Sequence, residues 1–230
     1  MSIDRIQADK LLSLAVHELR TPASVTAGYV KMVLQFHGQS LSDDARKFLV
    51  DAADSSAKLA ALLSEMGELS NLMAGNIPLK SEEVAIFAMA AEVAGTMTDA
   101  EQRGVRVEVA GADPAVRFKG DAHWLRTSLR AIVAATVRER IRPGVVRLEC
   151  RVARAGRYRW AILGIGADEA AEVLASLPPG RWGPFDLWRG GVGLSLPTAV
   201  HIITAHGGRI GSLPGAPVRG AAAIALPIRE

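Results

Sequence analysis

Residues 42–73 read SDDARKFLVDAADSSAKLAALLSEMGELSNLM. Apolar side chains recur in this stretch in alternating steps of three and four residues, and only Ser55 interrupts the series Ala45, Phe48, Ala52, Leu59, Leu62, Met66, Leu69 and Met73. Such a sustained heptad repeat predicts a long helix with coiled-coil-like packing. Ser42 stands where a helix N-cap is expected, and Asp43 and Asp44 follow it at the positive end of the helix dipole.

The residues before this stretch predict a partner helix. They keep the same apolar rhythm, through Leu12, Val16, Leu19, Ala23, Thr26, Val30 and Val33, and a short turn over residues 37–42 separates the two helices. Two antiparallel helices cannot enclose both apolar seams. We therefore expect a homodimer in which two helical hairpins form a four-helix bundle.

Strand and helix patterns mix after residues 74–78, which read as a linker. We expect helices over residues 81–104 and 121–140, strands over 105–110, 146–152 and 158–163, and a final helix, turn and strand that end near residue 227. The predicted fold is α+β. It comprises a dimerising two-helix domain over residues 1–75 and a two-layer α/β sandwich over residues 76–230.

The composition narrows the classes of partner. A net charge of +3 over 230 residues is too weak to indicate nucleic acid or membrane binding, and no apolar run approaches the roughly 20 residues that span a bilayer. A single cysteine, Cys150, excludes an internal disulfide and suits a reducing compartment. We expect a cytoplasmic protein in which Cys150 is an inert core residue. Only sixteen residues precede His17, so we expect no sensor domain within the residues before it.

Eight arginines crowd residues 138–159: Arg138, Arg140, Arg142, Arg147, Arg151, Arg154, Arg157 and Arg159. They form either a solvated face or a basic surface for an acidic receiver domain or nucleic acid. No aromatic stacking pattern accompanies them, so we favour the solvated face and expect no nucleic acid partner.

The hexad His17-Glu18-Leu19-Arg20-Thr21-Pro22 carries the chemistry of the first helix. Val16 and Leu19 lie on the seam, so His17 stands beside it, half exposed. Glu18 can accept a hydrogen bond from one ring nitrogen, which leaves the other nitrogen as a nucleophile. Thr21 shares the face of His17 and could orient a water molecule, whereas Pro22 should bend the helix because it cannot donate to the Glu18 carbonyl.

This hexad resembles the phospho-acceptor motif of two-component histidine kinases, with Val16 where the family usually has serine. In that family the histidine is phosphorylated from ATP and passes the phosphoryl group to an aspartate on a response-regulator receiver domain. The resemblance implies that His17 is the phospho-acceptor and Glu18 a general base. It implies that Thr21 assists dephosphorylation of the regulator and that Arg20 has a conformational or electrostatic role.

Residues 82–228 resemble the ATP-binding domain of the same family, with a phenylalanine box at 184–189 and the second glycine box at 191–196. The glycines that match a nucleotide pocket are Gly164, Gly166, Gly191 and Gly193. We assign them to a residual cofactor-binding pocket. The alternative is that strand-to-helix turns simply require glycine there.

Three departures from the family pattern remove contacts that the family makes with Mg-ATP. Ala135 stands where the family has an asparagine that binds Mg²⁺, and Ile162 stands where an aspartate reads the adenine amino group. Between the phenylalanine and second glycine boxes, only Gly190 remains of the ATP lid. We expect Mg-ATP binding to be weak or lost, and no metal site.

The sequence therefore predicts a homodimeric, histidine-kinase-like protein. It would exchange phosphoryl groups between His17 and a receiver aspartate, or dephosphorylate the regulator, and draw the group from a partner kinase or a phosphorylated regulator. Two alternatives stay open. One is an autokinase with a divergent ATP pocket, and the other is a non-enzymatic dimeric scaffold that sequesters a response regulator.

Overall fold

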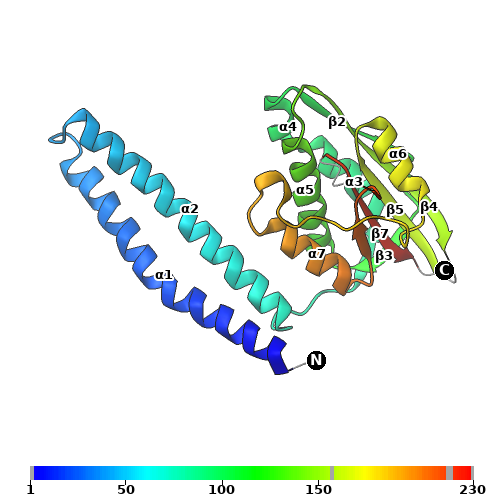
Figure 1. Ribbon diagram of the computed structural model, residues 1–230, viewed down its shortest axis with the longest axis horizontal. Coiled ribbons are helices and arrows are strands. Elements are labelled where there is room, and N and C mark those ends of the chain that lie inside the picture. The colour runs from blue at the N-terminus through cyan, green and yellow to red at the C-terminus, as the bar shows by residue number, and fades with distance from the viewer. Residues whose placement is uncertain (1–2, 156–157, 216–219, 229–230) are drawn as a thin grey trace. The chain divides into compact units, whose positions relative to one another are not determined.

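A computed structural model describes residues 3–155, 158–215 and 220–228 of the chain. The chain divides into two compact units, Met1–Pro78 and Leu79–Glu230. Figure 1 shows the first unit in blue and cyan and the second in green to red.

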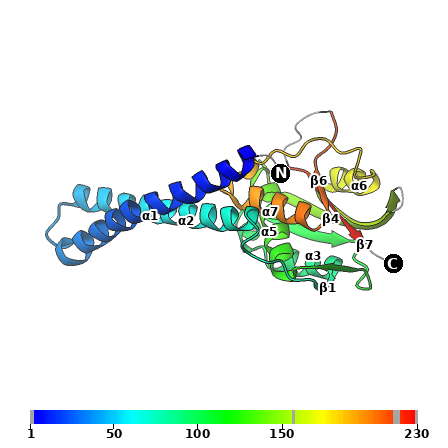
Figure 2. The same cartoon turned by 90° about the horizontal axis from the view of Figure 1, so that it is seen from below.

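The first unit consists of two long helices, α1 (Ile3–His37) and α2 (Asp43–Met73), which lie side by side and run in opposite directions (Figures 1 and 2). The predicted cap of α2 is confirmed, because the Ser42 hydroxyl accepts a hydrogen bond from the Ala45 N–H at 3.3 Å. Helix α1 continues through Pro22, whose carbonyl accepts a hydrogen bond from the Thr26 hydroxyl at 2.9 Å. Val16, Ala23 and Leu63 are buried.

Large apolar side chains of this unit remain exposed along both helices. On α1, Val25, Tyr29, Met32 and Phe36 follow steps of four, three and four residues, which place them on one stripe. On α2 the exposed apolar residues include four of the predicted seam: Phe48, Leu59, Leu62 and Met73. Contact between α1 and α2 thus covers only part of the apolar surface of these helices.

The second unit is built on a five-stranded sheet of order β2-β4-β5-β7-β6. Its strands are β2 (Val105–Ala110), β4 (Gly144–Ala155), β5 (Tyr158–Gly166), β6 (Arg209–Gly211) and β7 (Ala222–Ile228). β2 is parallel to β4, and the other pairs are antiparallel. Along β4, Val146, Leu148 and Cys150 are buried and alternate with the more accessible Arg147 and Glu149, as the sequence pattern predicts.

The single helix predicted over residues 81–104 is wrong. This segment forms β1 (Glu82–Ala85), α3 (Ile86–Gly95) and α4 (Thr98–Gln102). β1 pairs antiparallel with β3 (Arg117–Gly120), a partner more than thirty residues away that local periodicity cannot reveal. Thr96 follows the last turn of α3, where its hydroxyl donates to the Val93 carbonyl at 3.1 Å.

Helices cover both faces of the sheet. α3, α5 (Ala122–Arg138) and α7 (Ser195–Ala205) pack together on one side, and α6 (Asp168–Ser176) lies across β4, β5 and β7 on the other (Figures 1 and 2). α6 lies so close to β5 that a Cβ on Gly164 would stand 2.1 Å from the Ala171 carbonyl oxygen. The predicted two-layer sandwich did not include a helix, such as α6, on the second face of the sheet.

Asp121 and His206 join the start of α5 to the end of α7. The Asp121 carboxylate accepts hydrogen bonds from the Trp124 N–H at 3.1 Å and the Lys80 N–H at 2.9 Å, and its own N–H donates to His206 Nε2 at 2.9 Å. A backbone N–H only donates, so Nε2 is unprotonated, and the proton on Nδ1 is donated to the Ile202 carbonyl at 2.7 Å. Burial raises the pKa of the Asp121 carboxyl, but the backbone donors, with the nearby Lys80 charge, outweigh burial and lower it.

Candidate functional site

His17 and Glu18 form a solvent-facing pair on α1. His17 Nδ1 lies 3.3 Å from Glu18 Oε1, and the two side chains are 83% and 70% exposed. An ionised carboxylate accepts hydrogen bonds only, so this contact favours the tautomer with the proton on Nδ1. Nε2 then keeps its lone pair and is available as a nucleophile. His17 is thus more exposed than the half-buried position that the seam predicted.

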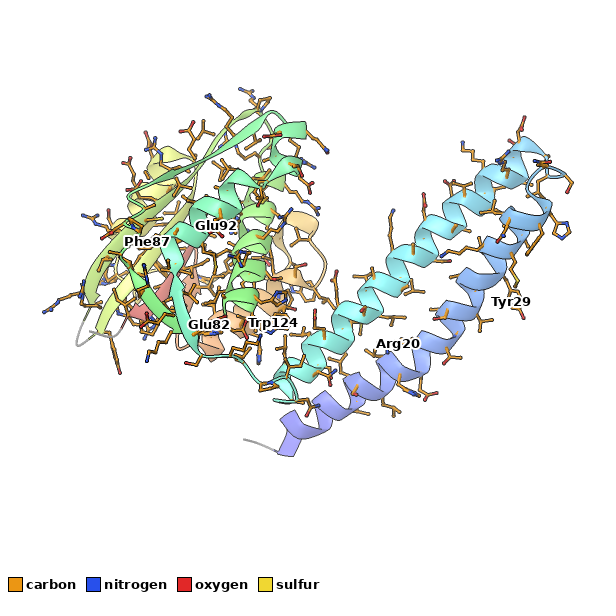
Figure 3. All side chains as sticks on the ribbon, turned by 180° about the vertical axis from the view of Figure 1, so that it is seen from behind. Arg20, Tyr29, Glu82, Phe87, Glu92 and Trp124 are labelled. Atoms are coloured by element: carbon orange, nitrogen blue, oxygen red, sulfur yellow. The ribbon has the colours of Figure 1, made fainter. Side chains whose placement is uncertain are left out.

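Arg20, labelled in Figure 3, extends from α1 to α2. A Cβ on Gly67 would lie 3.3 Å from the Arg20 Nη2 atom and 3.5 Å from Val16, so the glycine leaves room for the guanidinium. Thr21 is exposed one turn after His17. The structure therefore brings His17 and Glu18 into contact, whereas Arg20 contacts the second helix of the unit.

In the second unit, the position expected for the magnesium ligand is closed by the chain itself. Ala135, on α5, is buried, and Gly190 of the short 3₁₀ helix η1 (Arg189–Gly191) packs against it. A Cβ on Gly190 would lie 2.6 Å from Ala135 Cα and 2.7 Å from Ala135 Cβ. Gly190 also has a φ of +68°, which other residues rarely adopt. An asparagine side chain at position 135 would have to displace this backbone.

The four predicted glycines lie in two places. Gly164 and Gly166 are buried within β5, where Gly164 accommodates α6 and a Cβ on Gly166 would be 3.1 Å from the Ala221 Cβ. Gly191 and Gly193 have positive φ angles of +58° and +65°, as turn geometry requires. Ile162, at the position of the adenine-reading aspartate, packs in an apolar cluster with Trp160, Ala175 and Ala225.

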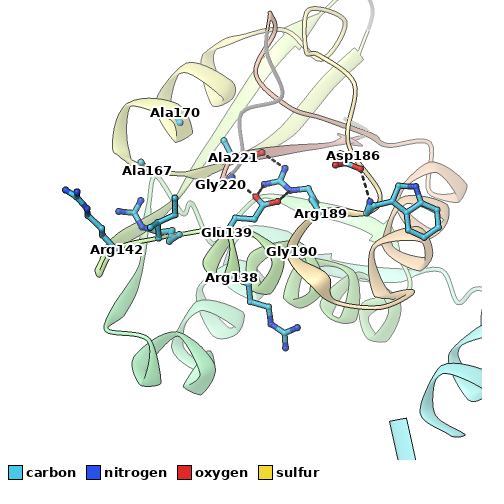
Figure 4. A pocket seen from close by; sticks show the side chains of 13 residues that line it. Arg138, Glu139, Arg142, Ala167, Ala170, Asp186, Arg189, Gly190, Gly220 and Ala221 are labelled. Carbon is cyan, nitrogen blue, oxygen red and sulfur yellow. Dashed lines mark hydrogen bonds and ion pairs between the residues drawn. The ribbon is translucent and has the colours of Figure 1, made fainter. Parts of the chain in front are cut away.

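A cavity of about 970 Å³ lies beside η1, and none of these four glycines lines it (Figure 4). Its floor is a buried ion pair between Arg189 and Glu139, whose side chains are 5% and 7% exposed. Arg189 Nε donates to Glu139 at 3.1 Å, Arg189 Nη1 donates to the Ala221 carbonyl at 2.5 Å, and the Gly220 N–H donates to Glu139 at 2.5 Å. The pair thus ties the end of α5 to η1 and to the start of β7.

The sequence did not single out Glu139 or Arg189 as partners. The only sign of this pair in the sequence was the position of Glu139, an acidic residue inside the arginine-rich segment 138–159. Three other arginines of that segment form hydrogen bonds with other parts of the second unit. Arg138 donates to the Gly191 carbonyl at 2.9 Å, Arg147 donates to Glu172 of α6, and Arg151 donates to Ser176 of α6. Arg157 lies outside the described residues.

The buried Cys150 thiol is protonated at neutral pH, because burial and then the nearby Glu149 charge raise its pKa to about 12. Across residues 3–155, 158–215 and 220–228, no three His, Cys, Asp or Glu side chains are grouped as a metal site would require. No helix within these ranges combines the length and the apolar character needed to cross a membrane.

No protein-family model matches the chain. The chain is similar to the phosphate regulon sensor protein PhoR of Pseudomonas aeruginosa strain PAO1, with 29% identity over 210 residues. The match covers 86% of this chain and 46% of PhoR, so the chain spans about half the length of that relative.

Two solved structures share the fold. Full-length ShkA, determined in complex with AMPPNP, superposes with a TM-score of 0.64 at 22% identity, over 95% of this chain and 45% of ShkA. The Acinetobacter baumannii histidine kinase AdeS superposes with a TM-score of 0.52 at 17% identity, over 93% of this chain and 98% of AdeS. The chain is thus similar in sequence to the sensor protein PhoR, and it shares its fold with ShkA and with the histidine kinase AdeS.

Proposed function

We propose that this chain transfers phosphoryl groups between His17 and the aspartate of a response-regulator receiver domain. The observation that carries the proposal is the exposed His17 ring, with Nδ1 against the Glu18 carboxylate and Nε2 free. In the transfer, the Nε2 lone pair attacks the phosphorus of the receiver's aspartyl phosphate. An N–P bond forms while the acyl O–P bond breaks, and the aspartate leaves as a carboxylate. Glu18 stabilises the positive charge that develops on the ring.

Dephosphorylation of the regulator is the second activity proposed for the same helix. Thr21 lies four residues after His17 and is exposed, so its hydroxyl can orient a water molecule towards the phosphorus of the bound aspartyl phosphate. This reaction does not require a phosphorylated histidine. The two activities therefore respond differently to substitutions at His17 and Thr21.

The proposal includes weak or absent Mg-ATP binding by residues 76–230. ShkA was solved with AMPPNP bound, but in this chain Gly190 lies against Ala135 and Ile162 is an apolar core residue. Each lost charged or hydrogen-bonding contact costs roughly 1.5–3 kcal/mol, so two lost contacts weaken binding by a hundredfold or more. Micromolar affinity for Mg-ATP in calorimetry would instead support the autokinase alternative.

Residues 1–75 are proposed to form a homodimer. The exposed stripe of Val25, Tyr29, Met32 and Phe36 on α1, together with Phe48, Leu59 and Leu62 on α2, requires an apolar partner. A second copy of the hairpin supplies the same surface and completes a four-helix bundle. Residues 76–230 then serve as a structural and docking domain.

The test is phosphotransfer from receiver domains loaded with acetyl phosphate. A wild-type chain mixed with its cognate phosphorylated regulator is expected to acquire an acid-labile phosphoryl group, and His17→Gln is expected to abolish it. His37→Gln is the matched control, because His37 is an exposed histidine on the same helix. Thr21→Ala should leave labelling intact and slow phosphate loss from the regulator, whereas Ser24→Ala, at an exposed hydroxyl on α1, should change neither.

If wild type and His17→Gln behave alike with every cognate regulator, phosphotransfer is wrong and the scaffold alternative takes its place. Binding of a regulator with unchanged affinity by both proteins would identify that scaffold directly.

A further inference from the structure

A second cavity lies beside Trp160, on the face of the sheet that α6 covers. Trp160 belongs to that face because it packs with Ala175 of α6. The cavity has a volume of about 620 Å³, in the range of sites that bind small organic molecules. The described residues that line it include none that line the cavity beside η1 and none of the four predicted glycines. This Trp160 cavity is therefore separate from the residual nucleotide pocket.

Rings form much of the wall of the Trp160 cavity. The rings of Tyr158 and Trp160 meet edge to face, with centroids 5.9 Å apart. Trp160 is held by the apolar cluster under α6, whereas Tyr158 is 49% exposed. Pro179, after the end of α6, and Pro227, near the end of β7, add two more rings of fixed shape. Such a wall favours contact with a flat apolar ligand.

The charge of this lining is positive. Arg181 and Arg209 line the cavity and no carboxylate does so among the described residues, which gives the lining a net charge of +2. The Arg209 Cζ atom lies 5.9 Å from the centroid of the Trp160 ring, within the range of a cation–π contact. A Cβ on Gly180 would lie 3.7 Å from Arg209 Nη1, so this guanidinium reaches the segment that carries Arg181.

Both arginines remain available to an anion. They are exposed, and neither forms an ion pair with a side chain in residues 3–155, 158–215 or 220–228. The donors that a guanidinium directs at a carboxylate are thus not used within the described chain.

The surrounding helices favour a singly charged anion over a phosphate. Residues 178–181 follow the C-terminal end of α6, and Gly207 follows that of α7, where helix dipoles are negative. No described residue of the lining belongs to the first turn of a helix, the position that commonly binds phosphate groups.

We propose that the Trp160 cavity binds a small aromatic carboxylate. The carboxylate accepts paired hydrogen bonds from Arg181 and Arg209, and the aromatic ring lies against Tyr158, Trp160 and Pro227. This site is independent of phosphotransfer at His17.

Calorimetry with 2-naphthoate tests the carboxylate contact on the full chain. The wild type is expected to bind, and Arg181→Gln and Arg209→Gln are each expected to weaken binding about three- to tenfold. Arg159→Gln is the matched control. Arg159 is an exposed arginine next to Trp160 on β5, and adjacent side chains of a strand point to opposite faces, so this variant should bind as the wild type does. The neutral 2-naphthamide, which has the same rings, should bind about tenfold more weakly than 2-naphthoate.

Arg181 and Arg209 are exposed, so their substitution should leave the fold intact, and circular dichroism of each variant verifies this. Failure of the wild type to bind 2-naphthoate at about 1 mM would overturn the proposal. An equal loss with Arg159→Gln would also overturn it, because the attraction would then be diffuse. So would equal binding of 2-naphthamide, or tighter binding of 2-naphthyl phosphate than of 2-naphthoate.

A pair of variants at Tyr158 tests the ring contact. Tyr158→Ser removes the ring and is expected to weaken 2-naphthoate several-fold, whereas Tyr158→Phe keeps the ring and should bind as the wild type does. Unchanged binding by Tyr158→Ser would overturn the assignment of the aromatic group to this wall.

Discussion

Removal of the Glu139 carboxylate should sharply destabilise the second unit. Glu139 and Arg189 are only 7% and 5% exposed, so in Glu139→Ala the guanidinium loses its counter-charge in a site that water hardly reaches. Breaking a buried ion pair by removing one partner costs about 3–5 kcal/mol. The Gly220 N–H loses its acceptor as well. For a unit of about 150 residues, the melting temperature should fall by roughly 6–20 °C.

The chain offers a selective assay for this effect. All four tryptophans, Trp124, Trp160, Trp182 and Trp188, belong to the second unit, so their fluorescence during urea unfolding reports on that unit alone. Glu139→Gln keeps an oxygen that can accept from Gly220 and removes only the charge. Its destabilisation should therefore lie between those of the wild type and Glu139→Ala.

A double variant separates the cost of the unpaired Arg189 charge from the cost of the lost hydrogen bonds. Glu139→Leu with Arg189→Met replaces the ion pair by apolar side chains and should recover much of the stability lost in Glu139→Ala, because no charge is left buried. Recovery stays incomplete, since the Ala221 carbonyl and the Gly220 N–H lose their partners. A loss below about 1 kcal/mol in Glu139→Ala, the size of an exposed pair, would refute the reasoning.

Three further predictions concern other parts of the molecule. Leu62→Glu, on the exposed face of α2, should give a folded monomer in light scattering. Leu63→Glu, at a buried position, should instead reduce helicity, and a wild-type monomer at micromolar concentration would contradict the dimer. Ala135→Asn should destabilise the second unit by about 1–3 kcal/mol in urea unfolding, because Gly190 fills the space, and Mg-ATP binding with unchanged stability would argue against a closed site. Asp121→Asn should lower the free energy of unfolding at pH 7, because the pKa of this carboxyl is lowered in the folded state. The stabilisation is present above the unfolded-state pKa of about 3.9 and is lost as the pH falls through the lower folded-state pKa. A difference in urea midpoint that persists unchanged at about pH 2 would contradict this.

Local patterns in the sequence were sufficient to predict several of the helices and strands. The heptad rhythm and Ser42 predicted the helix that begins at Asp43, and the alternation around Cys150 predicted a strand with a buried face. These features depend on periodicity and capping, which act over a few residues. The same holds for His17 and Glu18, since adjacent residues on one helix can form a hydrogen bond without a distant partner.

Only the tertiary structure decided features that join distant segments. Residues 82–85 form a strand because residues 117–120 pair with them, and local helical periodicity gives no sign of that partner. Gly164 is fixed by the close approach of α6, although its spacing to Gly166 resembles a nucleotide-binding motif. The Glu139–Arg189 pair joins residues fifty positions apart, and the fold that brings the end of α5 against η1 places both side chains in contact and out of water. The sequence by itself determined the helix that begins at Asp43 and the strand around Cys150, because periodicity and capping are local signals. Burial and charge pairing in the cavity were decided by the fold, because they depend on which surfaces meet.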